Sequence, residues 1–254
     1  MLMLALATAP PAWSLSYFVY DQWGGTWQDA NKNYKDDSLM CWAAAASNVL
    51  AWGKWGTATY TTTNSIFQHF KDHWTNNVGK AQVGWSWWFN GISPAASSKT
   101  SYVDVPGGGN FYPELTFSDY YRWGPYTEME IINQYFHLGY GAAIGIVKGL
   151  TMGHALTVWG FDYQKNGKKD LYSFTSIYVT DSDDGVYGLM NYSLTLKNGL
   201  YYLGGKYDGW YIDEAVCLKT SPISGYGVVP LPSAISLLTG GLALLLLGKR
   251  KIIV

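Results

Sequence analysis

Residues 35–50 read Lys-Asp-Asp-Ser-Leu-Met-Cys-Trp-Ala-Ala-Ala-Ala-Ser-Asn-Val-Leu, a polar approach followed by four consecutive alanines. Alanine has the highest helix propensity of all residues, so the second half of this stretch predicts a helix. Asp37 and Ser38 are suitable N-cap residues, which places Cys41 in the first turn of that helix. We expect the helix to end at about Trp52, because a glycine follows it.

Cys41 is the candidate nucleophile of this chain. At the start of a helix, unpaired N–H groups and the positive end of the helix dipole stabilise a thiolate over a thiol. The thiolate is the nucleophilic form of cysteine, so this position suits covalent catalysis. The competing interpretation is a small buried side chain in an alanine-rich helix. The polar residues before Cys41 argue against it.

Two further stretches predict partners for a nucleophilic cysteine. Residues 153–163 read as a strand with His154 at its start. Residues 177–185 read as a strand that runs into an acidic turn containing Asp181. The Asn-Gly pair at 166–167 is a strong hairpin signal between them. Such a hairpin can bring the histidine near the aspartate, which would orient the imidazole ring as in a catalytic triad.

At these residues the sequence resembles the immunoglobulin-degrading cysteine proteases of streptococci. The resemblance is carried by residues 29–32, 35–50 and 178–183, and by His154 with the Leu-Thr-Val-Trp-Gly run that begins two residues after it. The segments occur in the same order as in that family, whereas the long stretch from residue 53 to residue 150 does not match. Members of the family are papain-like enzymes, so the resemblance implies a peptidase.

The resemblance also implies a role for each of five residues. Cys41 would be the nucleophile, and His154 would be the general base and acid. Asp181 would orient His154, and Asp183 would support these residues without contacting the substrate. Lys32 would help to form the oxyanion hole, which needs donors aimed at the developing charge. The segment from Lys32 to Cys41 is one residue shorter than in the streptococcal enzymes.

We expect an α+β fold with the two-lobed architecture of papain-like cysteine proteases. One lobe would be helical and carry Cys41, with further helices over residues 65–73 and 127–138. The other lobe would be an antiparallel sheet that carries His154, because strand-forming segments dominate the C-terminal part of the chain. The Asn-Gly pair at 198–199 predicts a second hairpin in this sheet.

No cofactor or metal ion is expected. His69 and His73 have a spacing that can bind a metal, but the sequence has no HExxH motif and no obvious third ligand. The acidic turn at 181–185 does not fit the calcium loop of an EF-hand. The net charge is −1 and the only basic block lies at the C-terminus, so nucleic acid is not expected as a partner.

Two features leave alternatives open. We expect Cys217 to be a buried strand residue, but a disulfide between Cys41 and Cys217 would abolish the nucleophile. The chain holds 13 Trp and 21 Tyr. The aromatic cluster of Trp85, Trp87, Trp88 and Phe89 could line a substrate cleft, although packing in a core is the more ordinary role.

Both ends of the chain resemble targeting segments. Residues 1–14 are typical of a secretory signal peptide whose basic start is missing. Residues 228–254 hold a Pro-Leu-Pro motif, an apolar segment at 233–248 and a basic cluster, similar to the PEP-CTERM sorting signal of Gram-negative bacteria. This likeness implies export, sorting by an exosortase-like enzyme, and a transient or permanent membrane anchor at the cell envelope. A simple tail anchor is the alternative, and residues 15–227 between the two ends would be one peptidase domain.

The sequence therefore predicts an exported cysteine endopeptidase that acts on a protein or peptide substrate. Cys41 would attack the peptide carbonyl and His154 would move the proton. Two alternatives remain open. One is another acyl-transfer enzyme, such as an amidase or a transglutaminase-like enzyme. The other is a non-catalytic surface protein that binds a glycan or a protein through its aromatic side chains.

Overall fold

The computed structural model describes residues 14–91, 107–124, 129–149, 152–166, 171–183, 185 and 187–222. The chain divides into two units, Met1–Thr220 and Ser221–Val254, and every described helix and strand belongs to the first. The predicted signal peptide, apart from Ser14, lies outside the described residues. So does the predicted sorting signal with its apolar segment at 233–248. Among the residues that are described, no helix combines the length and apolar character needed to cross a membrane.

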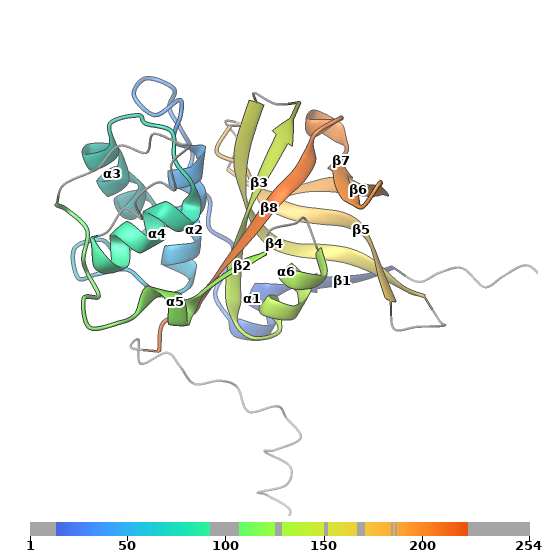
Figure 1. Cartoon of the computed structure of the whole chain (residues 1–254), viewed down its shortest axis with the longest axis horizontal. Helices are drawn as coiled ribbons and strands as arrows, with labels where there is room; N and C mark the ends of the chain where they lie inside the picture. The colour runs from blue at the N-terminus through green and yellow to red at the C-terminus, as the bar shows by residue number, and fades with distance from the viewer. Residues whose placement is uncertain are drawn as a thin grey trace, which may run out of the picture. The chain divides into compact units, whose positions relative to one another are not determined.

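Within the described residues, six antiparallel strands form a closed barrel (Figure 1). Their order around the barrel is β4, β3, β8, β7, β6, β5, and β5 pairs back with β4. The strands are β3 (Tyr140–Lys148), β4 (Met152–Asn166), β5 (Leu171–Thr180), β6 (Met190–Lys197), β7 (Leu200–Leu203) and β8 (Tyr211–Lys219).

Two additional strands extend the barrel wall. The long strand β4 pairs with β3 along its first half and with β1 (Ser14–Phe18) along its second half. On the other side, β2 (Tyr121–Gly124) pairs with β8. Both added strands are short. Each pairs with the part of a long strand that extends beyond the strand's neighbour in the barrel.

The predicted fold class, an α+β papain-like structure with a helical lobe and a sheet lobe, is wrong. The strands lie close to the segments that the sequence predicts as strands, but their sheet closes on itself. Closure depends on the pairing of β4 with β5, which shifts register after Val158 and again after Asp162. Such irregularities bend a strand and let a sheet curl into a barrel. The residues of a single strand do not indicate which two strands pair where the barrel closes.

The predicted hairpin at 198–199 is confirmed. β6 ends at Lys197 and β7 begins at Leu200, and the two strands are antiparallel neighbours. Asn198 and Gly199 have φ angles of 54° and 79°, the left-handed values that a two-residue turn of this kind requires. The turn predicted at 166–167 joins β4 to β5, and its glycine lies outside the described residues.

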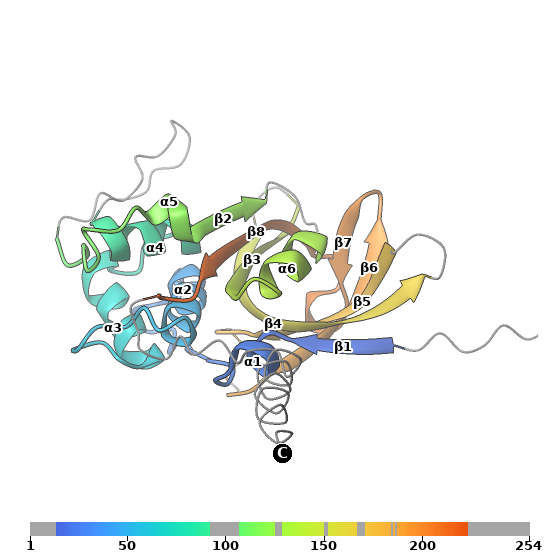
Figure 2. The same ribbon diagram turned by 90° about the horizontal axis from the view of Figure 1, so that it is seen from below.

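The described helices are short, and the three longest of them gather beside the barrel. The described helices are α1 (Val19–Trp23), α2 (Cys41–Trp52), α3 (Thr63–Trp74), α4 (Ala81–Asn90), α5 (Phe117–Tyr120), α6 (Met129–Phe136) and the 3₁₀ helix η1 (Gly205–Tyr207). Figure 1 shows α2, α3 and α4 grouped beside the barrel, and Figure 2 shows α6 at one end of the barrel. α3 and α6 confirm the helices expected over 65–73 and 127–138.

Two apolar cores stabilise this arrangement, one inside the barrel and one around α2. Successive residues of β3 and β8 alternate between them. Ile144 and Cys217 belong to the interior of the barrel, whereas Ala143 and Val216 face the helices. α2 is buried on almost every side, as an alanine-rich helix between a sheet and two helices must be.

The aromatic cluster on α4 is part of the helical core. Trp85, Trp87, Trp88 and Phe89 all have 0% of their surface exposed. Trp85 and Trp88 donate their indole N–H groups to the backbone carbonyls of Ala46 and Trp55. These four side chains therefore pack α4 against α2 and α3 and are not accessible to a ligand.

Candidate active site

Cys41 is the first residue of α2, as predicted, but the N-cap is Met40. Asp37 and Ser38 do not cap the helix. The buried carboxylate of Asp37 instead accepts hydrogen bonds from the backbone N–H groups of Asn33 and Tyr34 and forms an ion pair with Lys71 at 3.2 Å. Asp37 thus stabilises the loop before the helix, and the conformation of this loop fixes the position of Cys41.

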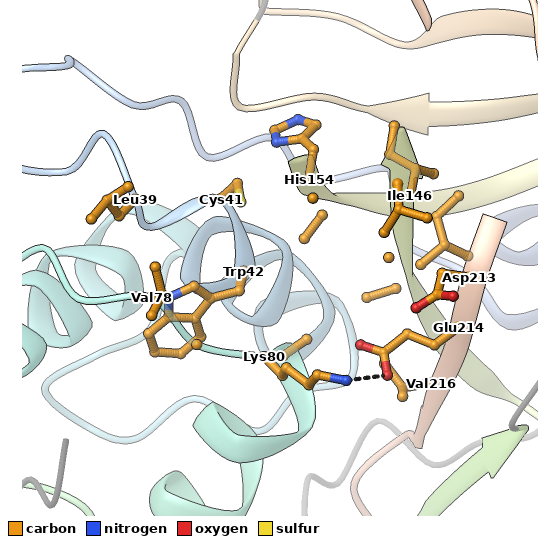
Figure 3. A pocket seen from close by; sticks show the side chains of 18 of the residues that line it. Leu39, Cys41, Trp42, Val78, Lys80, Ile146, His154, Asp213, Glu214 and Val216 are labelled. Carbon is orange, nitrogen blue, oxygen red and sulfur yellow. Dashed lines mark hydrogen bonds and ion pairs between the residues drawn. The ribbon is translucent and has the colours of Figure 1, made fainter. Parts of the chain in front are cut away.

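His154 lies near the start of β4, opposite Ile146 of β3. Its Nε2 atom is 2.8 Å from Oδ1 of Asp181, the residue that follows β5. The ring also lies beside the Cys41 side chain, and each group shifts the pKa of the other. Since Nε2 is engaged by Asp181, Nδ1 is the nitrogen that faces the sulfur. Figure 3 shows the two side chains together at one end of a pocket.

Asp181 is completely buried and is held by four donors. Its Oδ1 atom accepts from His154 and from the backbone N–H of Asp183, the latter at 2.9 Å. Its Oδ2 atom accepts from Nζ of Lys206 at 2.9 Å and from the Tyr207 hydroxyl at 2.7 Å. Burial opposes ionisation, but the hydrogen bonds from His154, Tyr207 and the backbone outweigh it and hold the pKa of Asp181 well below its usual range.

Lys206 and Tyr207 are site residues that the sequence analysis missed. Both lie on η1, in the connection between β7 and β8. The Tyr207 ring also stacks on the His154 ring, with centroids 5.6 Å apart and an interplanar angle of 26°. Burial and the neighbouring Asp181 charge raise the pKa of the Tyr207 hydroxyl, so it stays protonated and donates. A short Gly-Gly-Lys-Tyr turn carries no local signal that distinguishes it from an ordinary surface connection.

Lys32 and Asp183 lie in the same site and form an ion pair. Nζ of Lys32 is 2.5 Å from Oδ1 of Asp183 and donates to the carbonyl of Ser38 at 2.8 Å. The other carboxylate oxygen of Asp183 is 3.6 Å from Nδ1 of His154. The structure therefore brings Lys32, Asp183, Asp181, His154 and Cys41 together, and the individual roles assigned to them stay predictions.

The electrostatics of the site favour an ion pair between Cys41 and His154. Burial alone would raise the pKa of the Cys41 thiol, but the hydrogen bond and charge of His154, the Ala155 backbone and the Lys32 charge lower it overall. Burial likewise would lower the pKa of His154, but its hydrogen bonds to Asp181 and Cys41 raise it to about 9. Thiolate and imidazolium are the complementary forms of such a pair.

Cys217 differs from Cys41 in its location and in the pKa of its thiol. It is 1% exposed in the barrel interior, and burial raises the pKa of its thiol. Both cysteines are free. The expectation of a buried Cys217 is confirmed, and the alternative of a Cys41–Cys217 disulfide is wrong.

The pocket beside Cys41 has a volume of about 460 Å³. Cys41, His154, Lys32 and Asp183 line one end of it. Small residues of β3 and β4 form part of its wall, among them Ala143, Gly145, Gly153 and Ala155. Glu214 and Lys80 lie at the other end, joined by an ion pair (Figure 3). The Cys41 sulfur therefore lies beside a space large enough to hold an amino-acid side chain.

The site also contains a group of possible metal ligands. One ligand atom each of His154, Asp181 and Asp183 lie within 4.8 Å of one another. Protein donors already engage these carboxylates, because Asp181 binds Lys206 and Asp183 binds Lys32. The nearby lysines supply the positive charge that a metal ion would otherwise bring.

His69 and His73 are the other pair of possible ligands. Their ring nitrogens contact backbone carbonyl oxygens. Nε2 of His69 is 2.6 Å from the Gly108 carbonyl oxygen, and Nδ1 of His73 is 2.9 Å from the His69 carbonyl oxygen. Both rings also pack on Trp87. Both histidines therefore help to pack α3 against its neighbours.

No family model matches the chain, and no significant match is found among curated proteins. The resemblance to the streptococcal proteases and the likeness to the PEP-CTERM signal stay predictions.

Proposed function

We propose that this protein is a cysteine endopeptidase whose nucleophile is Cys41. One observation carries the proposal: at the end of an accessible pocket, Cys41 lies beside His154, and His154 is hydrogen-bonded to the buried Asp181. The series contains a thiol with a lowered pKa, a histidine that can exchange a proton with it, and a buried carboxylate that fixes the histidine ring. These are the three functions that nucleophilic catalysis by cysteine requires.

The proposed reaction follows from the positions of these atoms. The Cys41 thiolate attacks the carbonyl carbon of the bound peptide, and the carbonyl oxygen becomes an oxyanion. The imidazolium of His154 gives its proton to the leaving amine as the C–N bond breaks, which leaves a thioester on Cys41. Neutral His154 then takes a proton from water, and the resulting hydroxide attacks the thioester and releases the acid.

The oxyanion has two sources of hydrogen-bond donors. The first intrahelical bonds of α2 run from Ala43 and Ala44 to the Met40 carbonyl, so the N–H groups of Cys41 and Trp42 belong to the unbonded first turn. The Lys32 ammonium also lines the pocket, although its ion pair with Asp183 must loosen before it can donate to an oxyanion. The backbone groups are the better candidates, since they are fixed in place before the substrate binds.

The alternatives differ in how well they fit the site. A non-catalytic binder that used the aromatic cluster of α4 has little support, because those side chains are buried in the helical core. An amidase would hydrolyse the same kind of thioester and differ in the amide bond that it cleaves. A transglutaminase-like enzyme would transfer the acyl group to an amine in place of water. We further propose, on the sequences of the two ends alone, that the protein is exported to the cell envelope.

Alkylation of Cys41 tests the proposal. Iodoacetamide at about pH 5.5 reacts slowly with an ordinary thiol, whose pKa is about 8.5. We expect rapid labelling of Cys41 and none of Cys217 by mass spectrometry, with much slower labelling of Cys41 in His154→Ala. A denatured protein substrate, incubated with wild type and with Cys41→Ala, should be cleaved only by wild type. Slow labelling of wild type, or cleavage by Cys41→Ala, would contradict the mechanism.

A further inference from the structure

The end of the pocket away from Cys41 carries an irregularity in the pairing of β3 with β8. Gly145 pairs with Glu214, but the next residue, Ile146, pairs with Ile212. Asp213 is therefore the extra residue of a β-bulge. Successive residues of a regular strand point to opposite faces of a sheet, and a bulge re-aims one of them. As a result Asp213 and Glu214 both line the pocket (Figure 3).

This end of the pocket has more hydrogen-bond acceptors than donors. Glu214 binds Nζ of Lys80 at 2.8 Å and accepts from the Gln82 amide at 3.4 Å, both through Oε2. The Gln82 side-chain oxygen is buried and has no hydrogen-bond partner among the described residues. Among the described residues at this end of the pocket, two carboxylates face one lysine, so their summed charge is negative. A buried acceptor without a donor is unfavourable, and a rotation of the Gln82 side chain toward the pocket would let an N–H group of a ligand satisfy it.

The space at this end depends on a glycine. A Cβ atom at Gly145 would lie 3.0 Å from Cγ and 3.4 Å from Oε1 of Glu214. A larger residue at this position would require the Glu214 side chain to shift by a few tenths of an ångström. Gly145 therefore lets the carboxylate lie against the wall of the pocket, where Glu214 is largely shielded, with 17% of its side chain exposed.

We propose that Asp213, Glu214 and Gln82 form a subsite for a lysine or arginine side chain of the peptide substrate. The inference rests on the proposed function and names its substrate class. A cationic side chain brings the N–H donors that the Gln82 oxygen lacks, and its charge is attracted by the two carboxylates. An acidic side chain would be repelled, and an apolar one would leave the acceptors unpaired. Cys41 lies at the opposite end of the same pocket, so the subsite selects peptides whose basic residue lies close to the scissile bond.

Peptidyl chloromethyl ketones test this inference, because they need only a reactive cysteine and a bound peptide. In each reagent the Cys41 sulfur displaces chloride from the methylene carbon. Three matched series would carry lysine, norleucine or glutamate at each of the three positions before the reactive group. We expect a lysine reagent to alkylate wild type at least about tenfold faster than its norleucine counterpart, a difference of about 1.4 kcal/mol. The glutamate reagents should be the slowest.

Variants connect this preference to the subsite. Glu214→Gln should remove most of the preference for lysine, and Glu214→Lys should shift it toward glutamate. Asp213→Asn changes an exposed side chain and should weaken the preference even if the Glu214 variants fold poorly. Glu130→Gln, on the exposed face of α6, is the matched control and should behave as wild type. Iodoacetamide labelling of Cys41 should be equal in all of them.

The outcomes separate the two proposals. If lysine and norleucine reagents react equally while iodoacetamide still labels Cys41 rapidly, the subsite is wrong and the proposed nucleophile stands. If the preference for lysine persists unchanged in both Glu214→Gln and Asp213→Asn, the cationic side chain is bound elsewhere and the subsite is also wrong. If Cys41 of wild type reacts with neither class of reagent, both proposals fail.

Discussion

The side-chain amide of Asn48 donates to the hydroxyl oxygen of Thr157 at 2.9 Å, and this contact joins the helix of Cys41 to the strand of His154. Asn48 lies seven residues after Cys41 on α2, and Thr157 lies three residues after His154 on β4. The same amide is 3.3 Å from the hydroxyl of Thr180, the residue before Asp181. One buried side chain thus connects the three elements that carry the candidate triad.

Asn48 also holds the segment that bears Lys32. Its carbonyl oxygen accepts from the backbone N–H of Ala30 at 2.8 Å, and Thr180 donates to the Gln28 carbonyl at 2.8 Å. We expect Asn48→Ala to lower the free energy of unfolding by about 1–3 kcal/mol, because it leaves buried groups unpaired. Labelling of Cys41 at low pH should slow as the geometry loosens. Urea unfolding and iodoacetamide kinetics measure the two effects.

The control for this experiment is Asn64→Ala, which removes an exposed amide from the first turn of α3. It should leave the labelling rate of Cys41 unchanged. If Asn48→Ala were as stable and as reactive as wild type, Asn48 would have no positioning role.

The hydroxyl of Tyr207 should affect the stability of the protein in acid. Because the pKa of Asp181 is lowered in the folded state, its contribution to stability is present above pH about 4 and is lost as the pH falls. Tyr207→Phe removes one donor to Asp181 and keeps the ring on His154. We expect a loss of about 1 kcal/mol at neutral pH and an acid unfolding midpoint shifted to higher pH. Circular dichroism during acid titration measures this shift, and Tyr202→Phe, on β7, is the control.

The pH dependence of Cys41 alkylation should report the ion pair with His154. The pKa of the thiol is lowered in the folded protein, so we expect the labelling rate to remain high well below the pH at which a free cysteine loses its reactivity. In His154→Ala the burial of Cys41 is no longer offset, and its pKa should rise. At pH about 5.5 each unit of that rise lowers the thiolate fraction about tenfold. A profile that is identical in the two proteins would contradict the pairing.

The lowered pKa of Cys41 and the raised pKa of His154 should have opposing effects on stability between pH about 6.5 and about 9. Taken alone, the raised pKa of His154 stabilises the fold at the lower pH and loses this effect as the pH rises to about 9. The lowered pKa of Cys41 acts in the opposite direction over the same window. A thiolate beside an imidazolium holds as many protons as a thiol beside a neutral imidazole, so the two effects offset one another wherever these forms predominate. Unfolding of wild type and of a Cys41→Ala/His154→Ala variant should therefore show parallel pH profiles in this window.

A double variant separates the two possible roles of Lys32. Lys32→Met removes a positive charge near Cys41 and leaves Asp183 unpaired beside His154, so iodoacetamide labelling should slow. Lys32→Met/Asp183→Asn restores the charge balance and should recover the labelling. Peptide hydrolysis should recover with it if Lys32 acts through charge alone. If Lys32 also stabilises the oxyanion, hydrolysis should stay lower by about 100-fold.

Much of the local structure, and the elements that carry the candidate triad, can be predicted from the sequence alone. The alanine run predicts α2 with Cys41 in its first turn, because helix propensity is a local property. The strands of His154 and Asp181 follow from their strand-forming residues, and the turn at 198–199 follows from Asn-Gly. Each of these signals depends on residues that are close in sequence.

Only the tertiary structure decides how these elements close around the site. The pairing of β4 with β5 makes a barrel where an open sheet lobe is expected, since hydrogen bonding between strands depends on registers that no single strand encodes. Asp37 lies where an N-cap is expected, but its carboxylate binds the preceding loop and Lys71. Tyr207 reaches Asp181 from 26 residues away in the chain. The bulge at Asp213 likewise appears only when β8 is aligned with β3. Contacts between distant residues depend on the whole packed chain, and for that reason local patterns do not predict them.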